Sequence, residues 1–256
     1  MEIRTIKIKK FVEFHELVSQ ERQLGTLYRG VSNSDYKLIA SIGRYYKKID
    51  KDTLYDREQK VFKLFKNEAA LYQDVSTLNN WDVLALAQHY GLPTRLLDWS
   101  LNPLVALFFA VSQDYNSDGS VYVAKDSVSS ENWLYCNEDL LKKNDPFSLD
   151  KPYIYVPVHL THRLKAQWGA FVIQPDPTQE YKCSNMLKLI IPAKMKADFF
   201  DILYNYDIHF KTLFPDLTGL ANSLKWSHFD SNQHNQNGSH DTHSYKSNID
   251  DEIPIL

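Results

Sequence analysis

Two apolar segments flank the polar stretch Gln88-His-Tyr-Gly-Leu-Pro-Thr-Arg-Leu-Leu-Asp-Trp-Ser100. Before it, residues 80–90 carry apolar side chains at helical spacing, and Gly91 predicts the end of that helix. After it, Asn102-Pro103 predicts the start of a second helix over 104–111, which is apolar nearly all round and therefore buried. Polar groups held between two buried helices predict a site rather than an ordinary surface loop.

Arg95 and Asp98 are the charged residues of this stretch, and leucines and a tryptophan surround them. Burying such charges costs several kcal/mol unless they are paired or bind something. One interpretation is that the two side chains pair with each other and hold the turn together. The other is that one of them faces a ligand while its partner orients it. The sequence leaves both interpretations open.

Two further polar residues stand beside predicted strands. Arg29 lies in the short apolar run 27–31, and its guanidinium suits bidentate binding of phosphate or carboxylate. Gln167 precedes a predicted strand over 169–173, whose first residue, Gly169, permits close approach of a backbone or a ligand. The alternative for Gln167 is a buried residue whose amide hydrogen-bonds within the core.

The bulk composition is that of one large domain. The chain has 256 residues, of which 43% are hydrophobic and 24% charged, with a formal net charge of −3. That charge does not predict nucleic-acid binding through bulk electrostatics. Cys136 and Cys183 are too far apart for a metal-binding or redox motif. Without an apolar leader or a membrane-length apolar run, we expect a cytoplasmic protein that does not contact the membrane.

The predicted elements alternate unevenly, which favours an α+β fold over a doubly wound sheet. Residues 227–256 begin with a polar, apolar-poor run that predicts a disordered tail, and its histidines follow no metal-ligand spacing. We therefore expect one domain over residues 1–226 and no metal site. The loop 33–51 carries a basic face. The expected helices are 11–22, 55–74, 80–90, 104–111, 196–205 and 214–224, and the expected strands are 27–31, 119–124, 152–160, 169–173 and 187–191.

Together these segments resemble the FRG domain, a family named for a Phe-Arg-Gly or Tyr-Arg-Gly motif near its start. Here the motif is Tyr28-Arg29-Gly30, and the family's long signature resembles residues 88–99 followed by 103–110. Later elements of the family resemble residues 163–171 and 213–221. The family occurs widely in bacteria and their mobile elements, which implies an accessory role such as phage defence.

The layout is also similar, more distantly, to the ADP-ribosyltransferase superfamily. That resemblance implies a mixed, split sheet flanked by helices and a pocket for NAD or a related nucleotide. It implies that Arg29 contacts phosphate, that Ser100 and Gln167 contact ribose, and that Asp98 orients Arg95 or supplies negative charge. Gln167 stands where those enzymes carry a glutamate, and an amide cannot supply that charge. The implied catalytic residues are Arg29, Asp98 and Gln167, and the implied nucleotide-binding residues are Tyr28, Arg29, Gly30, Gln88, His89, Tyr90, Arg95, Trp99, Ser100 and Gln167, with Tyr90 or Trp99 stacking on a ring.

Two other functions stay open. The basic stretch Arg44 to Lys51, with tyrosines interleaved, suits a nucleic-acid-binding or processing domain, and a protein or nucleic acid could also be the acceptor of a transfer reaction. A sensor or partner-binding module without catalysis is the third possibility, and loss of the acidic catalytic residue favours it. A hydrolase built on His89 and Asp98 is not predicted, because no serine occupies a nucleophile elbow. The sequence does not determine the oligomeric state.

Overall fold

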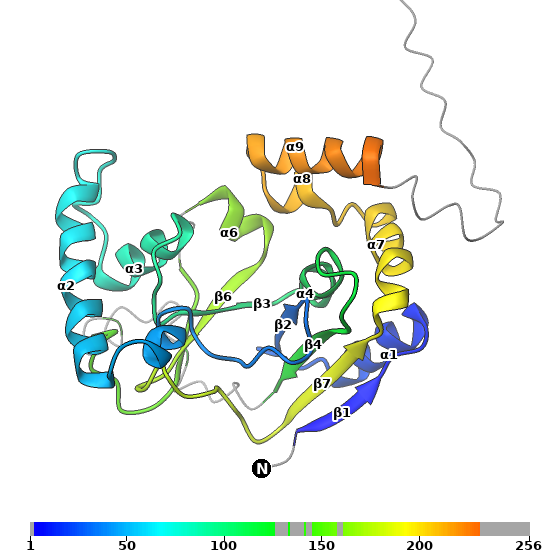
Figure 1. Cartoon of the computed structure of the whole chain (residues 1–256), viewed down its shortest axis with the longest axis horizontal. Coiled ribbons are helices and arrows are strands. Elements are labelled where there is room, and N and C mark those ends of the chain that lie inside the picture. Colours follow the sequence, from blue (N-terminus) through cyan, green and yellow to red (C-terminus); the bar gives the residue numbers. More distant parts are fainter. Residues whose placement is uncertain (1–2, 126–132, 134–140, 142–144, 158–160, 231–256) are drawn as a thin grey trace, which may run out of the picture.

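Seven strands form one open sheet in the computed structural model, which describes residues 3–125, 133, 141, 145–157 and 161–230 (Figure 1). The strand order is β1-β7-β4-β2-β3-β6-β5. β1 runs parallel to β7, and every other neighbouring pair of these strands is antiparallel. The mixed sheet flanked by helices confirms the predicted single α+β domain. The strands are β1 (Arg4–Lys7), β2 (Leu27–Val31), β3 (Leu97–Ser100), β4 (Gly119–Ala124), β5 (Tyr153–Tyr155), β6 (Gly169–Ile173) and β7 (Met186–Ile191).

The sheet has two halves that meet at a single residue pair. β2 pairs with β4 along its whole length, and β3 pairs with β6 along its whole length. Between β2 and β3, by contrast, only Tyr28 and Ser100 are paired. The transferase resemblance predicted a split sheet. The structure instead has a single sheet, in which this one pair joins the half β1-β7-β4-β2 to the half β3-β6-β5.

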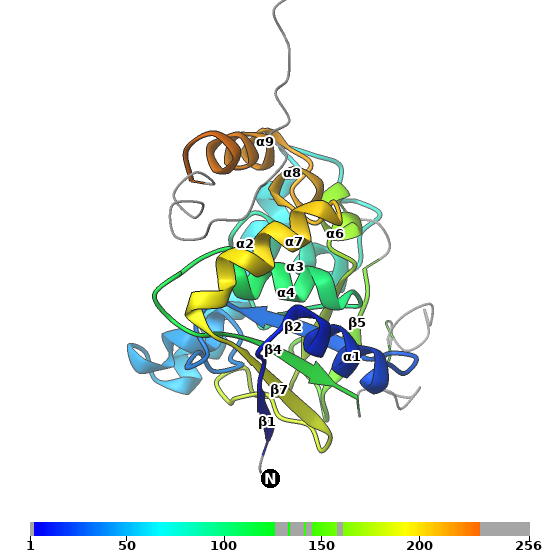
Figure 2. The ribbon, with the colours of Figure 1, turned by 90° about the vertical axis from the view of Figure 1, so that its right-hand side faces the viewer.

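Helices α1 (Phe11–Glu21), α4 (Pro103–Val111) and α7 (Lys196–Asn205) pack against one face of the first half, as Figure 2 shows for α4 and α7, which lie above β2 and β4 in that view. Their apolar side chains, such as Phe14, Phe108 and Phe200, form the largest buried cluster with residues of the sheet. The strong apolar character of α4 is explained by this burial, as the sequence predicted.

Helices α2 (Lys51–Ala69) and α3 (Asn80–His89) cover the second half, at the opposite end of the molecule from α1 and α7 (Figure 1). Trp81 of α3 packs on Tyr155 of β5, with ring centroids 5.4 Å apart. Gly91 has φ +89°, and the backbone N–H groups of Gly91 and Leu92 donate to carbonyls of α3. The predicted glycine stop of this helix is therefore confirmed.

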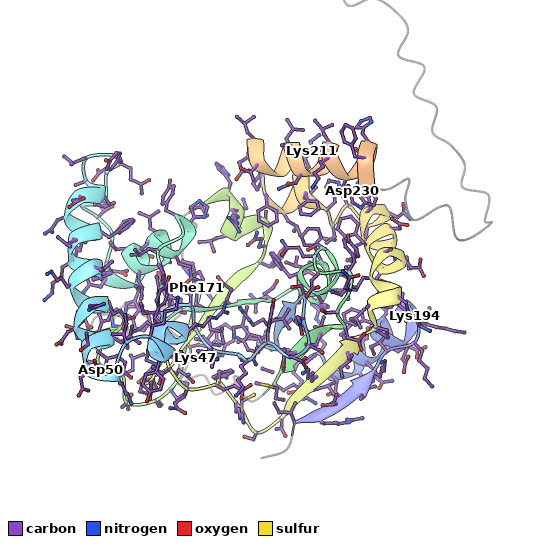
Figure 3. The ribbon with its side chains drawn as sticks, in the orientation of Figure 1. Lys47, Asp50, Phe171, Lys194, Lys211 and Asp230 are labelled. Carbon is purple, nitrogen blue, oxygen red and sulfur yellow. The ribbon has the colours of Figure 1, made fainter. Side chains whose placement is uncertain are left out.

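Several element boundaries differ from the prediction, and local capping explains two of them. α2 begins at Lys51 rather than 55 because the Asp50 side chain accepts from the backbone N–H of Thr53 at 3.0 Å. Asp50 lies at the lower end of α2 in Figure 3. The helix expected over 214–224 is α9 (Leu217–Lys225), which begins three residues later because the Asp216 side chain accepts from the backbone N–H of Gly219 and caps it. The remaining helices are η1 (Ile42–Lys47), α6 (His162–Ala166), η4 (Ala193–Met195), α8 (Phe210–Leu213) and the π-helical η5 (Trp226–Asp230).

Part of the sequence-based prediction falls outside the described residues. This applies to residues 231–256 of the predicted tail, to Cys136, and to 158–160 of a predicted strand. Within the described part of the chain, no cluster of three metal-ligating side chains occurs, and no helix is both long and apolar enough to cross a membrane.

Candidate functional site

The candidate site lies where β2 and β3 separate. In a continued antiparallel ladder Gly30 would lie opposite Asp98, two residues beyond the Tyr28–Ser100 pair. Instead, the guanidinium of Arg29 donates to the backbone carbonyl of Asp98, and its Nη1 lies 3.7 Å from the Asp98 carboxylate. The junction between the two half-sheets therefore presents an arginine and a carboxylate instead of a continuous ladder.

Burial holds the pKa of Arg29 below its usual value, and the nearby Arg44 lowers it further, while Asp98 opposes both. The Nε of Arg29 is buried and has no hydrogen-bond partner in the described part of the chain. A guanidinium in this state has donor capacity to spare, because one carboxylate at 3.7 Å and one carbonyl do not use its five N–H groups.

A hydrogen-bond chain through the long signature fixes the carboxylate. Gln88 donates from Nε2 to Asp98 Oδ1 at 2.6 Å. Its Oε1 in turn accepts from the Thr94 hydroxyl, so the amide can turn only its nitrogen towards Asp98. Thr94 is held by Ser41, whose hydroxyl accepts from the Thr94 N–H at 2.9 Å and donates to its carbonyl at 3.1 Å. The signature residues thus orient Asp98 towards Arg29.

On one side of the Gln88–Asp98 pair lies a hollow of about 210 Å³, called here the Arg29 hollow. Its polar lining comes from Arg29, Ser41, Arg44, Gln88 and Asp98. Asp98 is the single carboxylate among these lining residues, and the two arginines outnumber it. The hollow therefore favours an anionic group. Its volume is below the 300–1,000 Å³ typical of enclosed ligand pockets, so it suits one part of a larger ligand.

On the other side lies a smaller hollow of about 70 Å³, called here the His89 hollow. It shares Gln88 and Asp98 with the first and adds His89, Arg163 and Gln167. Phe171 of β6 also lines it and is labelled left of the centre of the molecule in Figure 3. Gln167 donates from Nε2 to the carbonyl of Leu213 at 3.1 Å, which fixes its amide against α8.

Of the two interpretations that the sequence left open for Arg95, the local pairing with Asp98 is wrong. Arg95 is 2% exposed, and it makes a bidentate ion pair with Glu58 of α2, with Nε–Oε1 at 2.9 Å and Nη2–Oε2 at 2.5 Å. Its remaining Nη1 donates to the carbonyl of Pro146 at 3.1 Å. Arg95 therefore faces away from both hollows, because a distant helix supplies the carboxylate that the sequence-based interpretation sought nearby.

Four other residues that were predicted to bind the ligand pack in the core or hydrogen-bond to the backbone. Tyr28 and Trp99 are 2% and 3% exposed, so their rings belong to the core and offer no free face to a base. An added Cβ at Gly30 would lie 1.7 Å from the carbonyl oxygen of Ala106, so this glycine lets α4 pack on β2. Ser100 donates to the carbonyl of Gln167 at 2.7 Å and accepts from the N–H of Asn102.

Tyr90 is 66% exposed at the end of α3, so much of its ring is open to solvent, although it makes an edge contact with the His89 ring at 5.0 Å between centroids. The residues that the sequence brought to one site and the structure also brings together are therefore Arg29, Gln88, His89, Asp98 and Gln167.

Sequence reasoning missed Arg44, Ser41, Thr94 and Arg163 as members of the site. Thr94 and Arg163 lay inside motifs already singled out, so their position in those motifs was an available signal. Arg44 was noted only as part of a basic loop, and its approach to Arg29 depends on the fold of 33–51.

Comparison with protein families matches residues 25–119 to the FRG domain model. This segment is an FRG domain. It supplies the whole lining of the Arg29 hollow, whereas Arg163 and Gln167 of the His89 hollow come from later elements. No curated protein and no solved structure matches the chain in the corresponding searches.

Proposed function

We propose that the FRG domain binds a phosphate-bearing small molecule, NAD or a related nucleotide, with a phosphate in the Arg29 hollow. The observation that carries this proposal is the pair of arginines, Arg29 and Arg44, which line one concave surface beside a single carboxylate. A guanidinium with unused donors at the junction of two half-sheets is suited to bidentate binding of phosphate oxygens.

The residues present fit part of a dinucleotide. The Arg29 hollow admits a phosphate or ribose, while Tyr90, Tyr45 and Tyr46 offer exposed rings at 66%, 41% and 52% for stacking outside it. NAD supplies a glycosidic bond whose cleavage leaves positive charge on the ribose. Asp98 is the single carboxylate that lines either hollow, and its side chain is 64% exposed. Asp98 rather than Gln167 would then place negative charge beside that ribose.

Calorimetric titration of the whole chain with NAD up to millimolar concentration tests the binding proposal. Arg44→Gln is expected to weaken NAD binding about tenfold, because a charge-assisted hydrogen bond contributes about 1.5–3 kcal/mol. Lys47→Gln removes the same charge from the same short helix and is the matched control, because Lys47 does not line the hollow. Its affinity should stay within twofold of the unmodified chain. No heat with NAD at millimolar concentration would remove the proposal.

Group transfer is tested separately, with NAD labelled in its adenylate half and a mixture of protein, RNA and DNA acceptors. Label transfer or nicotinamide release that is lost in Asp98→Asn would support an ADP-ribosyltransferase. Binding without either product would favour a sensor or a partner-binding module.

A second candidate function is nucleic-acid binding. Tyr45 and Tyr46 are exposed on η1 together with Arg44 and Lys47, which places aromatic rings among cations beside the Arg29 hollow. Lys51 is engaged in an ion pair with Asp176 at 2.7 Å, so it adds little free charge to that surface. Unchanged electrophoretic mobility of RNA and DNA at low salt would exclude this function.

A further inference from the structure

We propose that the His89 hollow is a second anion subsite, formed by Arg163 and His89 and separated from the Arg29 hollow by the Gln88–Asp98 pair. The nucleotide or its acceptor then carries a second phosphate or carboxylate group. This inference rests on the proposed function only in assigning both hollows to one reaction site. The subsite itself stands on its own residues.

Arg163 is the cation of this hollow. It is half-buried on α6, and its guanidinium lies 4.4 Å from the ring centroid of Phe214. In the part of the chain that the structure describes, no carboxylate pairs with it. A half-buried guanidinium stacked on an aromatic ring keeps its edge N–H groups free, and those groups suit an oxyanion.

His89 lies on the facing helix, α3, and lines the same hollow. Burial holds the pKa of His89 below its usual value and Arg163 lowers it further, while Asp216 at the start of α9 opposes them. Asp98 of β3 also lines the hollow. The imidazole therefore lies between one cation and two carboxylates from different elements, and an anion in the hollow would favour its protonated form.

The hollow is large enough for a compact anion. Its volume of about 70 Å³ is several times the roughly 15 Å³ that holds one water molecule. Gln88 and Gln167 line it with amides whose orientation is fixed by hydrogen bonds to Asp98 and to the carbonyl of Leu213. A phosphate or carboxylate would thus meet a fixed arginine and a histidine that can take up a proton.

Sulfate is the probe, because it stays a dianion over the pH range in which histidine titrates. The whole chain, labelled with ¹³C at the histidine Cε1, is titrated with sulfate from pH 5.5 to 8, and chloride keeps the ionic strength constant. His89→Gln identifies the resonance. Sulfate should move this resonance and raise the pKa of His89 by roughly one unit. By linkage, sulfate should therefore bind more tightly as the pH falls through the pKa of His89 in the sulfate complex.

Variants on α6 locate the effect. Arg163→Gln should weaken sulfate binding at His89 at least tenfold, whereas Arg163→Lys should keep part of it. Lys165→Gln removes one charge from the same helix at an exposed position outside the hollow, and should change the affinity less than twofold. The subsite would be refuted if sulfate left the His89 resonance unchanged. It would also be refuted if Lys165→Gln weakened sulfate binding as much as Arg163→Gln.

The source of the second anionic group is distinguished by competition. Displacement of sulfate from His89 by NADP⁺ but not by NAD⁺ would assign the group to the nucleotide, and simultaneous binding of sulfate with either would assign it to the acceptor. The NAD titration on the same samples separates the two proposals. If sulfate shifts the His89 resonance but NAD does not bind, only the nucleotide assignment is refuted. If NAD binds but sulfate leaves the His89 resonance unchanged, only the subsite is refuted.

Discussion

Two arginine–carboxylate pairs lie within the same FRG domain, and they differ in how completely they are satisfied. Arg95 and Glu58 have side chains 2% and 3% exposed and form a bidentate pair. Arg29 and Asp98 have side chains 15% and 64% exposed, and their closest charged atoms are 3.7 Å apart. The first pair leaves no capacity for a ligand. The second leaves a guanidinium Nε without a partner beside a hollow.

The environment of each arginine accounts for the difference. Arg95 lies 5.0 Å from the ring centroid of Phe147 and uses its third donor group on the carbonyl of Pro146. Such a pair persists only because each charge is fully compensated in a low-dielectric interior. Arg29 lies at the junction of two half-sheets, where the missing ladder bonds leave room for another molecule. Burial alone therefore does not distinguish a structural arginine from one that faces a ligand. The two differ in whether every guanidinium nitrogen has a hydrogen-bond partner among the residues that the structure describes.

The largest expected effect comes from breaking the Arg95–Glu58 pair, called here the closed pair because its charged groups are fully paired. Glu58→Gln leaves the buried Arg95 without a countercharge and should lower the free energy of unfolding by about 3–5 kcal/mol. Urea unfolding monitored by tryptophan fluorescence measures this loss. The double variant Glu58→Leu/Arg95→Met replaces both charges with apolar groups and should recover most of the stability. A loss below about 1 kcal/mol in Glu58→Gln would show that the pair is not closed.

The Arg29–Asp98 pair is called here the open pair. A substitution in it should change the affinity for NAD more than the free energy of unfolding. Arg29→Met removes the guanidinium but keeps an unbranched side chain, and should cost about 1 kcal/mol of stability through one lost hydrogen bond. Its NAD affinity should fall more than tenfold, because the principal phosphate donor is gone. Calorimetry and urea unfolding of the same preparation give both values. A stability loss as large as that of Glu58→Gln would make Arg29 a structural residue.

The fold was predictable from sequence wherever the pattern was local and strong. The helices observed as Asn80–His89 and Pro103–Val111, and the strand Gly119–Ala124, follow from periodicity and from glycine and proline at their ends. Arg4–Lys7 and Leu97–Ser100 were not predicted as strands. Each has only four residues and carries polar side chains, so sheet pairing with distant partners decides its structure.

The site was predictable as a location but not as a set of contacts. The Tyr-Arg-Gly motif and the long signature led to Arg29, Gln88 and Asp98, which the fold does bring together. The partner of Arg95 could not be found, because Glu58 is 37 residues away in a helix most of whose other charged positions are exposed. Contacts that depend on the packing of one helix against a distant loop carry no signal in the local sequence.

A smaller effect is expected from neutralising the open carboxylate. Asp98→Asn keeps the shape and should change the free energy of unfolding by no more than about 1 kcal/mol, because the Asp98 carboxylate is largely exposed and its ion pair is long. Sulfate affinity should rise several-fold, since the one carboxylate shared by both hollows is lost. Titration with sulfate at constant ionic strength checks this, and Asp35→Asn, at an exposed loop position outside both hollows, serves as the control. Weaker sulfate binding in Asp98→Asn would mean that Asp98 orients Arg29 more than it repels the anion.

The smallest effect concerns the surroundings of the closed pair at alkaline pH. The Tyr55 ring centroid lies 5.8 Å from the Arg95 guanidinium, and the Tyr55 hydroxyl donates to Asp176 at 2.8 Å. Burial, together with Asp176, raises the pKa of Tyr55 to about 12. Because an unfolded tyrosine ionises near pH 10, this contribution to stability is complete below pH 10 and is lost as the pH rises towards 12.

The free energies of unfolding of the unmodified chain and of Tyr55→Phe should therefore become more similar as the pH rises from 9 to 11. Urea unfolding of both chains over this range measures the difference. Tyr45→Phe, at an exposed position, corrects for the other tyrosines that titrate in this range. A partly exposed tyrosine is screened by solvent, so the change should be smaller than that of any variant above. Stability curves for Tyr55→Phe and the unmodified chain that stay parallel over this range would show that Tyr55 ionises equally in the folded and unfolded states. The shell around Arg95 would then be open to water, and the contrast between the two arginine pairs would be weaker than their exposed fractions indicate.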